Sequence, residues 1–140
     1  MDDTSILFCD EAVYPRTLES IELTSLRLDE WFENGSVPLE TRNDIHICVD
    51  ELMSNFFYYS EASEIRVKYI LYNDDICITL SDDGVPFDPM ARESRVEKPE
   101  KGKRVQIGGL GITMVRQMTK KMTYQYEEGR NTLELYFAIA

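Results

Sequence analysis

Two polar side chains four residues apart, Glu51 and Asn55, lie in the segment VDELMSNFFYYS. In a helix this spacing places both on one face, at the margin of the apolar stripe that contains Leu52 and Phe56. A carboxylate beside a carboxamide can hold a hydrated Mg²⁺ and orient a nucleophile. The pair also fits an ordinary surface glutamate beside a locally bonded asparagine, and taken alone it favours that simpler interpretation.

A second motif, SDDGVPFDP, begins at Ser81 directly after an apolar run. A strand that ends at Asp82 delivers one carboxylate to a fixed place, and Gly84 lets the backbone approach a flat ligand closely. Such a carboxylate can accept a hydrogen bond from an exocyclic amino group such as that of adenine. The same residues also fit a simple Asp-Gly turn, which makes the motif a weak signal alone.

The third motif, GGLGITMV, runs from Gly108 to Val115. Glycines clustered at a helix start leave several backbone N–H groups free to surround phosphate oxygens, and the helix dipole favours an anion there. The segment is not a Walker A loop, because no Gly-Lys-Ser/Thr follows. A flexible loop with a glycine-tolerant cap is an equally good interpretation of this motif alone.

The elements that position these motifs follow from hydrophobic periodicity. Apolar residues recur at helical spacing in two early segments and alternate in the two that follow, where Asn73-Asp74-Asp75 predicts a hairpin turn. The glycines at 108–111 open a third helix, and Glu128-Gly129-Arg130-Asn131 joins two last strands. We expect an edge strand at 5–9, helices at 17–33, 39–59 and 110–121, and strands at 65–71, 76–80, 122–127 and 132–139.

The order of these elements predicts the fold class. Helices come first, then strands, with one helix inside the strand region, which is typical of an α+β fold. We expect a single domain over 1–140, a two-layer sandwich with the helices on one face of a mixed, largely antiparallel sheet. The turn-rich stretch 81–107 is long for a compact domain, and loops of that length are usually functional. Its part at about 90–107 is the candidate lid.

Charge and composition exclude several classes of protein. The net charge is −11, and residues 1–64 hold 15 acids and 3 bases, whereas 92–121 hold 3 acids and 9 bases. An acidic protein with one cationic stretch can bind an anionic ligand and disfavours direct nucleic-acid binding. Charge alone favours a simpler interpretation, a solvated lysine-rich loop and helix. No apolar run approaches the roughly 20 residues that span a membrane. The acidic start has no basic n-region, so we expect no signal peptide, and the spacing of Cys9, Cys48 and Cys77 indicates reduced, buried thiols. A cytoplasmic location is therefore expected.

Taken together, the three motifs are much stronger than each alone. The order of a helical E-x-x-x-N, a strand followed by D-x-G-x-P-F-D-P, a basic loop and G-G-L-G before a helix resembles the N, G1 and G2 boxes of the GHKL (Bergerat-fold) ATPases. The resemblance covers about residues 15–139. The Pro86-Phe87-Asp88 form of G1 and G-G-L-G-I-x-M-V-R are most similar to the anti-sigma serine kinase branch. Sensor histidine kinases would carry a phospho-accepting histidine, and His46 lies at no such place.

The resemblance implies a role for individual residues. Glu51 matches the acid that polarises the attacking hydroxyl, and Asn55 matches the Mg²⁺ ligand that links the metal to the triphosphate. Asp82 matches the carboxylate that reads adenine, with Gly84 as its close-approach partner. Gly109, Leu110 and Gly111 match the phosphate side of the ATP site.

The presumed lid supplies the remaining candidates. Lys101, Lys103 and Arg104 are cations that could meet the γ-phosphate, although no motif match supports that choice. The chain departs from the family at Tyr59, where members often carry a histidine, and at Pro86, where the wider superfamily has a glycine. Both departures leave the substrate class open.

By resemblance, the cofactors are ATP and Mg²⁺, and the function is that of an anti-sigma factor with protein-serine kinase activity. Its partners would be a sigma factor and a small antagonist protein, and a homodimer is possible. The alternatives are a nucleotide-gated binding module without phosphotransfer, and a domain that kept the fold and lost ATP. Intact Glu51, Asn55, Asp82 and Gly109 argue against the last of these.

Overall fold

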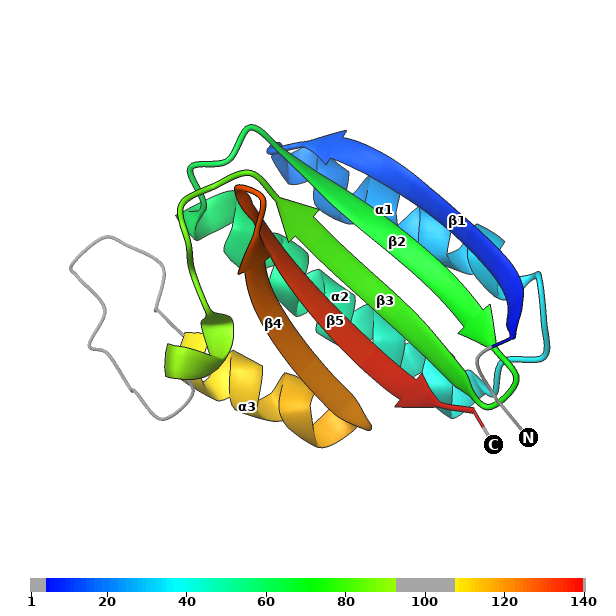
Figure 1. Cartoon of the computed structure of the whole chain (residues 1–140). Coiled ribbons are helices and arrows are strands. Elements are labelled where there is room, and N and C mark those ends of the chain that lie inside the picture. Colours follow the sequence, from blue (N-terminus) through cyan, green and yellow to red (C-terminus); the bar gives the residue numbers. More distant parts are fainter. Residues whose placement is uncertain (1–4, 93–107, 140) are drawn as a thin grey trace.

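The computed structural model describes residues 5–92 and 108–139, which form a five-stranded sheet with helices packed on one face (Figure 1). The three predicted helices and both strand pairs are present, with shifted boundaries. In chain order the elements are β1 (Ile6–Pro15), α1 (Leu18–Phe32), α2 (Leu39–Tyr59), β2 (Glu64–Tyr72), β3 (Asp75–Asp82), the 3-10 helix η1 (Pro89–Arg92), α3 (Gly108–Met118), β4 (Lys121–Glu127) and β5 (Arg130–Ala138).

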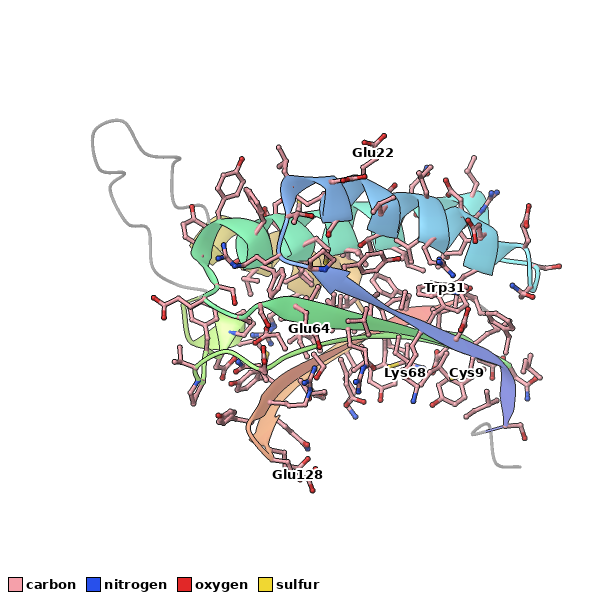
Figure 2. The ribbon with its side chains drawn as sticks, turned by 90° about the horizontal axis from the view of Figure 1, so that it is seen from above. Cys9, Glu22, Trp31, Glu64, Lys68 and Glu128 are labelled. Atoms are coloured by element: carbon pink, nitrogen blue, oxygen red, sulfur yellow. The ribbon has the colours of Figure 1, made fainter. Side chains whose placement is uncertain are left out.

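The sheet has the strand order β1-β2-β3-β5-β4, and every pairing between the described strands is antiparallel. The α+β sandwich is therefore confirmed, and the expected mixed sheet is in fact wholly antiparallel. Figure 2 shows the two layers from above, with Glu22 on the outer side of α1 and Lys68 on the sheet face that the helices leave open. No helix in the described ranges is long and apolar enough to cross a membrane.

The core lies between the helices and the inward face of the sheet. Strand side chains alternate across the two faces, so every second residue of β2, β3 and β5 points to the helices. Helix α2 covers them with an apolar stripe at helical spacing. The buried strand residues include Val67, Tyr69, Ile76, Ile78, Leu135 and Phe137, and those of α2 are Ile45, Cys48, Val49, Leu52, Met53 and Phe56.

Strand β1 is ten residues long, although the sequence predicts a strand only over 5–9. The missed half carries Asp10, which interrupts the apolar pattern. Its carboxylate Oδ2 accepts a hydrogen bond of 2.9 Å from the Trp31 indole N–H on α1. This bond is the main cause that lowers the pKa of Asp10. A polar residue thus faces the helical layer because its partner is a buried tryptophan, which pattern alone does not predict.

Helix α3 ends at Met118, three residues before the predicted end at 121. The Lys120 backbone N–H donates to the carbonyl of Tyr136 at 2.7 Å, which already begins the pairing that β4 continues with β5. Lys120 Nζ also lies 2.9 Å from an oxygen of Asp75. The chain therefore turns from helix to strand almost without a loop.

The expectation of three buried thiols is wrong for one cysteine. Cys48 and Cys77 are buried, whereas Cys9 is exposed on edge strand β1. Burial raises the pKa of Cys48 to about 12 and raises that of Cys77 as well. Only Cys9, among the cysteines, is placed to react with reagents from solvent.

Candidate functional site

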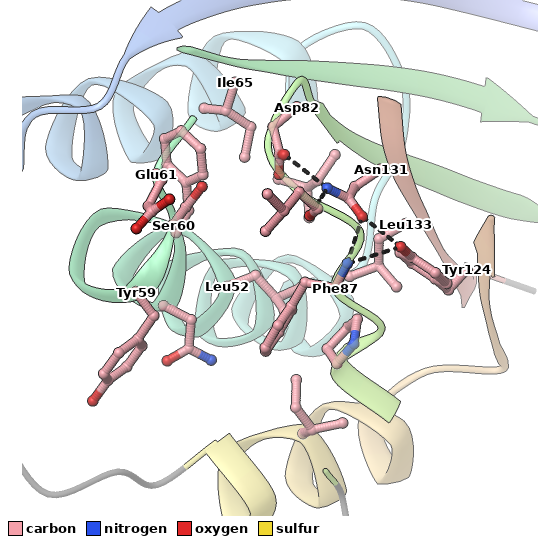
Figure 3. A pocket seen from close by; sticks show the side chains of 16 residues that line it. Leu52, Tyr59, Ser60, Glu61, Ile65, Asp82, Phe87, Tyr124, Asn131 and Leu133 are labelled. Carbon is pink, nitrogen blue, oxygen red and sulfur yellow. Dashed lines mark hydrogen bonds between the residues drawn. The ribbon is translucent and has the colours of Figure 1, made fainter. Parts of the chain in front are cut away.

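A cavity of about 310 Å³ opens at one end of the sandwich, between α2, α3 and the ends of β3 and β5 (Figure 3). Most of its wall is apolar, and a few polar groups converge on it, which is typical of a small-molecule site. The apolar wall includes Leu52, Phe56, Ile65, Leu80, Ile112 and Leu133.

Asp82 is the last residue of β3 and lies in this cavity wall. It shares the inward parity of Ile78 and Leu80, so the strand itself aims the carboxylate at the cavity. Oδ1 accepts two hydrogen bonds, from the Gly84 backbone N–H at 2.9 Å and from Asn131 Nδ2 at 3.1 Å. Oδ2 accepts none from the residues that the structure describes. One carboxylate oxygen is therefore held in place, and the other is available to a ligand.

Gly84 lies where the chain after β3 passes close to the turn that follows α2. A Cβ at this position would lie 3.1 Å from Asp82 Oδ1 and 3.3 Å from the Cβ of Ala62. Real Cβ atoms seldom approach other atoms so closely, and the neighbours would have to move. The glycine thus permits both the turn contact and the Asp82 bond that its own N–H makes.

The structure adds Asn131 and Tyr124, which the sequence analysis did not identify. Asn131 Oδ1 accepts a hydrogen bond from the Tyr124 hydroxyl and another from the Phe87 backbone N–H, the second at 2.9 Å. Burial is the main cause that raises the pKa of Tyr124, so its hydroxyl stays protonated and can donate at neutral pH. One signal in the sequence could have identified Asn131, since it shares the inward parity of Leu133 and Leu135. A polar residue at that parity indicates a buried bond.

Asn55 lies on α2 and lines the same cavity as Asp82. Its side-chain oxygen Oδ1 is buried and has no hydrogen-bond partner among the described residues. A buried carbonyl oxygen without a partner costs free energy, and a bound ion or water is one way to satisfy it. An oxygen of this kind is a ligand that Mg²⁺ accepts.

Glu51 lies one turn before Asn55 and packs against α3. A Cβ on Gly111 would lie 2.5 Å from Glu51 Oε1 and 2.8 Å from its Cδ, so a larger residue there would displace this carboxylate. Gly109 and Leu110 belong to the first turn of the same helix, which begins at Gly108. The first N–H groups of a helix have no intrahelical partner, and they attract anions.

Two of the predicted site residues, Asn55 and Asp82, line the cavity, and Gly84 adjoins it through Asp82. Glu51 and Gly111 meet beside it at the contact of α2 with α3. Lys103, Arg104 and the predicted lid at 90–107, apart from the residues of η1, lie outside the described residues.

The sequence is similar to known proteins over most of its length. Residues 14–137 match the model of the histidine kinase-like ATPase domain family. The chain is 28% identical over 122 residues to the serine-protein kinase RsbW of Listeria monocytogenes, covering 82% of this chain and 78% of that protein. It is 25% identical over 123 residues to RsbW of Staphylococcus epidermidis, covering 82% and 77%.

Solved structures share the fold at low identity. A Mycobacterium tuberculosis protein with RsbU and RsbW domains superposes with a TM-score of 0.65 at 13% identity, over 93% of this chain. This chain spans only 32% of that solved chain. The catalytic domain of the histidine kinase ThkA superposes with a TM-score of 0.53 at 11% identity, over 93% of this chain and 97% of that one.

The family match therefore covers both sides of the cavity, from the end of β1 through Asn55 and Asp82 to β5. Membership of an ATPase-domain family implies that the chain binds ATP. The chain belongs to the histidine kinase-like ATPase domain family, and its relatives include the RsbW serine-protein kinases.

Proposed function

We propose that this protein is an ATP-dependent protein-serine kinase that acts on a small antagonist protein and also binds a sigma factor. The observation that carries the proposal is the pairing of Asp82 and Asn55 in one cavity, each with an oxygen that no described residue engages. One is suited to a base with an amino group, and the other to a cation. Similarity to RsbW, named as a serine-protein kinase, supports the kinase reading.

Adenine would occupy the apolar cavity. A planar ring gains free energy from burial against Leu52, Ile112 and Leu133, and its amino group can donate to Asp82 Oδ2. The triphosphate would then extend toward the N-terminal turn of α3, where the glycines of the motif place backbone N–H groups.

Asn55 would hold Mg²⁺ against the phosphates, because its buried oxygen lacks another partner. When bound, the metal ion neutralises charge that develops on the transferred phosphoryl group. The protein's own share is to keep the Asn55 carboxamide on α2, one helical turn from Glu51, so that the metal ligand and the base keep a fixed separation.

Glu51 would act as the base in the transfer. The serine hydroxyl of the substrate would give its proton to the Glu51 carboxylate, its oxygen would bond to the γ-phosphorus, and ADP would leave with the bridging oxygen. Contact with Gly111 on α3 holds this carboxylate beside the turn that receives the phosphates. The contact between Glu51 and Gly111 thereby links the base to the phosphate site.

The first experiment identifies the partner. The purified protein captures binding proteins from extract of the native cell, with and without Mg-ATP, and γ-³²P-ATP then tests whether a captured protein is labelled on serine. We expect Glu51→Gln to abolish labelling while ADP binding persists, and the neighbouring exposed Asp50→Asn, with the same charge change, to retain it.

Two outcomes contradict the proposal in different ways. If Mg-ADP and Mg-ATP give no thermal stabilisation, the ATP site itself is wrong. If nucleotide binds but no partner is labelled, and Glu51→Gln has no effect on partner release, the protein is a nucleotide-gated binding module instead. A homodimer and a cytoplasmic location remain predictions from the family resemblance and the composition.

A further inference from the structure

Asn131 is the most highly connected polar side chain of the cavity. It is 7% exposed and pairs with Asp82 across the ladder of β3 and β5. Its amide Nδ2 donates to Asp82 Oδ1 at 3.1 Å and to the backbone carbonyls of Gly84 at 3.3 Å and Val85 at 2.8 Å. Figure 3 shows this side chain at the centre of the dashed bonds, between Asp82, Phe87 and Tyr124.

The carboxamide has no unused hydrogen-bonding capacity. Its oxygen accepts from the Phe87 N–H and from the Tyr124 hydroxyl, which fills both lone pairs, and its two protons serve three acceptors. A side chain bonded on both sides in this way has one orientation. It also joins the strand residue Asp82 to the segment 84–87, which forms another part of the cavity wall.

This arrangement decides which part of the Asp82 carboxylate meets a ligand. Asn131 and the Gly84 N–H both bond Oδ1, so the carboxylate cannot rotate without losing two hydrogen bonds. Oδ2 therefore has a fixed place in the cavity. A charge-assisted bond to a ligand depends strongly on such placement.

We propose that Asn131 is a positioning residue that sets the preference of the site for 6-aminopurines over 6-oxopurines. It acts through Asp82 and rests on the proposed ATP-binding function. A fixed Oδ2 meets the 6-amino donor of adenine and repels the 6-oxo group of hypoxanthine. A carboxylate that can rotate would instead accept the neighbouring N1–H of hypoxanthine, and the discrimination would fall.

The test compares Mg-ADP with Mg-IDP by calorimetric titration. The two nucleotides differ only at the purine 6-position and in the proton that hypoxanthine carries on N1. In the wild type we expect ADP to bind about 10–100-fold more tightly, as a hydrogen bond to a charged group implies. Asn131→Ala should lower this ratio at least about fivefold. The matched control is Thr132→Ala, the next residue on the opposite face of β5, which should keep the wild-type ratio.

The ratio of ADP to IDP affinity shows whether Asn131 positions the Asp82 carboxylate or has only a general structural role. If Asn131→Ala weakens both nucleotides equally and keeps the ratio, the proposal is overturned. If Asn131→Ala shows no cooperative melt, Asn131→Ser serves in its place, because the short serine hydroxyl cannot reach Asp82 and the 84–87 segment together. An unchanged ratio of ADP to IDP affinity in Asn131→Ser also overturns the proposal. A wild-type protein that binds neither nucleotide refutes the proposed function, whereas wild-type discrimination with an unaffected variant refutes this inference alone.

Discussion

Removing the Asn55 side chain should stabilise the ligand-free protein, although it destroys part of the site. Asn55 Oδ1 is buried without a partner in the described structure, and an unsatisfied buried polar atom costs about 1–3 kcal/mol. Asn55→Ala removes this cost and loses the packing of only two further heavy atoms. Alanine also favours the helix over asparagine by roughly 0.6 kcal/mol.

Ser54→Ala is the matched control, because it is the preceding residue of α2, is also half-buried and gains similar helix propensity. The difference between the two variants therefore isolates the unpaired oxygen. We expect Asn55→Ala to exceed Ser54→Ala by about 1 kcal/mol in the free energy of unfolding, which corresponds to roughly 3 °C in Tm.

The assay is thermal unfolding of each variant in EDTA, with Mg²⁺ alone, with ADP and with Mg-ADP. In the wild type, Mg-ADP at about 100 Kd should add roughly 2.7 kcal/mol. In Asn55→Ala, ADP should stabilise to the same extent with Mg²⁺ or with EDTA. If this variant melts below Ser54→Ala without ligand, the Asn55 oxygen has a structural bond in solution, and the argument that it awaits a cation is refuted.

Three further predictions follow from other contacts of the site and the sheet. Asp82→Asn should weaken ADP binding about 10–100-fold in calorimetry, because a charge-assisted bond becomes a neutral one; a change under twofold would contradict the adenine assignment. Gly111→Ala should displace the Glu51 carboxylate and lower the phosphotransfer rate about 100-fold. Tm should change by less than about 4 °C, because the helix propensity that alanine adds offsets a rotamer change of Glu51 of similar size. A large fall in Tm with full transfer would disprove this contact. At pH 8, Ellman's reagent should label Cys9 rapidly and Cys48 only on unfolding, because Cys48 is buried and a pKa of about 12 leaves about one thiolate in 10⁴. Labelling of every cysteine at one rate would show that the burial is wrong.

The fold could be predicted from the sequence wherever one face of an element is apolar. Alternation in β2 and β3 and the stripe of α2 predict their type and their buried sides. Prediction failed where a polar residue bonds a partner that lies far away in sequence. Asp10 bonds Trp31 and interrupts the apolar pattern, so the second half of β1 was not predicted. Asn131 was not predicted either, because its partner Asp82 is also distant in sequence.

The candidate site shows the same limit. Asn55, Asp82 and Gly84 were predicted by motif order, since those motifs carry recognisable residue types at fixed spacing. Asn131 follows Gly129 and Arg130 in a segment typical of a hairpin turn. Nothing local indicates that it reaches a carboxylate 49 residues earlier. That bond exists because β5 pairs with β3 in the middle of the sheet, and strand order is not a local property of the sequence.

The pairing of β5 with β3 also bears on how the domain acquires its ability to bind. Both central strands contribute a side chain to the cavity, yet residues 83–129 separate them in the chain. Contacts between distant segments form slowly, because a large loop must close first. During synthesis the ribosome must release β5 before Asp82 acquires its bond from Asn131. Nucleotide affinity should therefore appear only with the completed sheet, and a nascent chain that ends within α3 should have none.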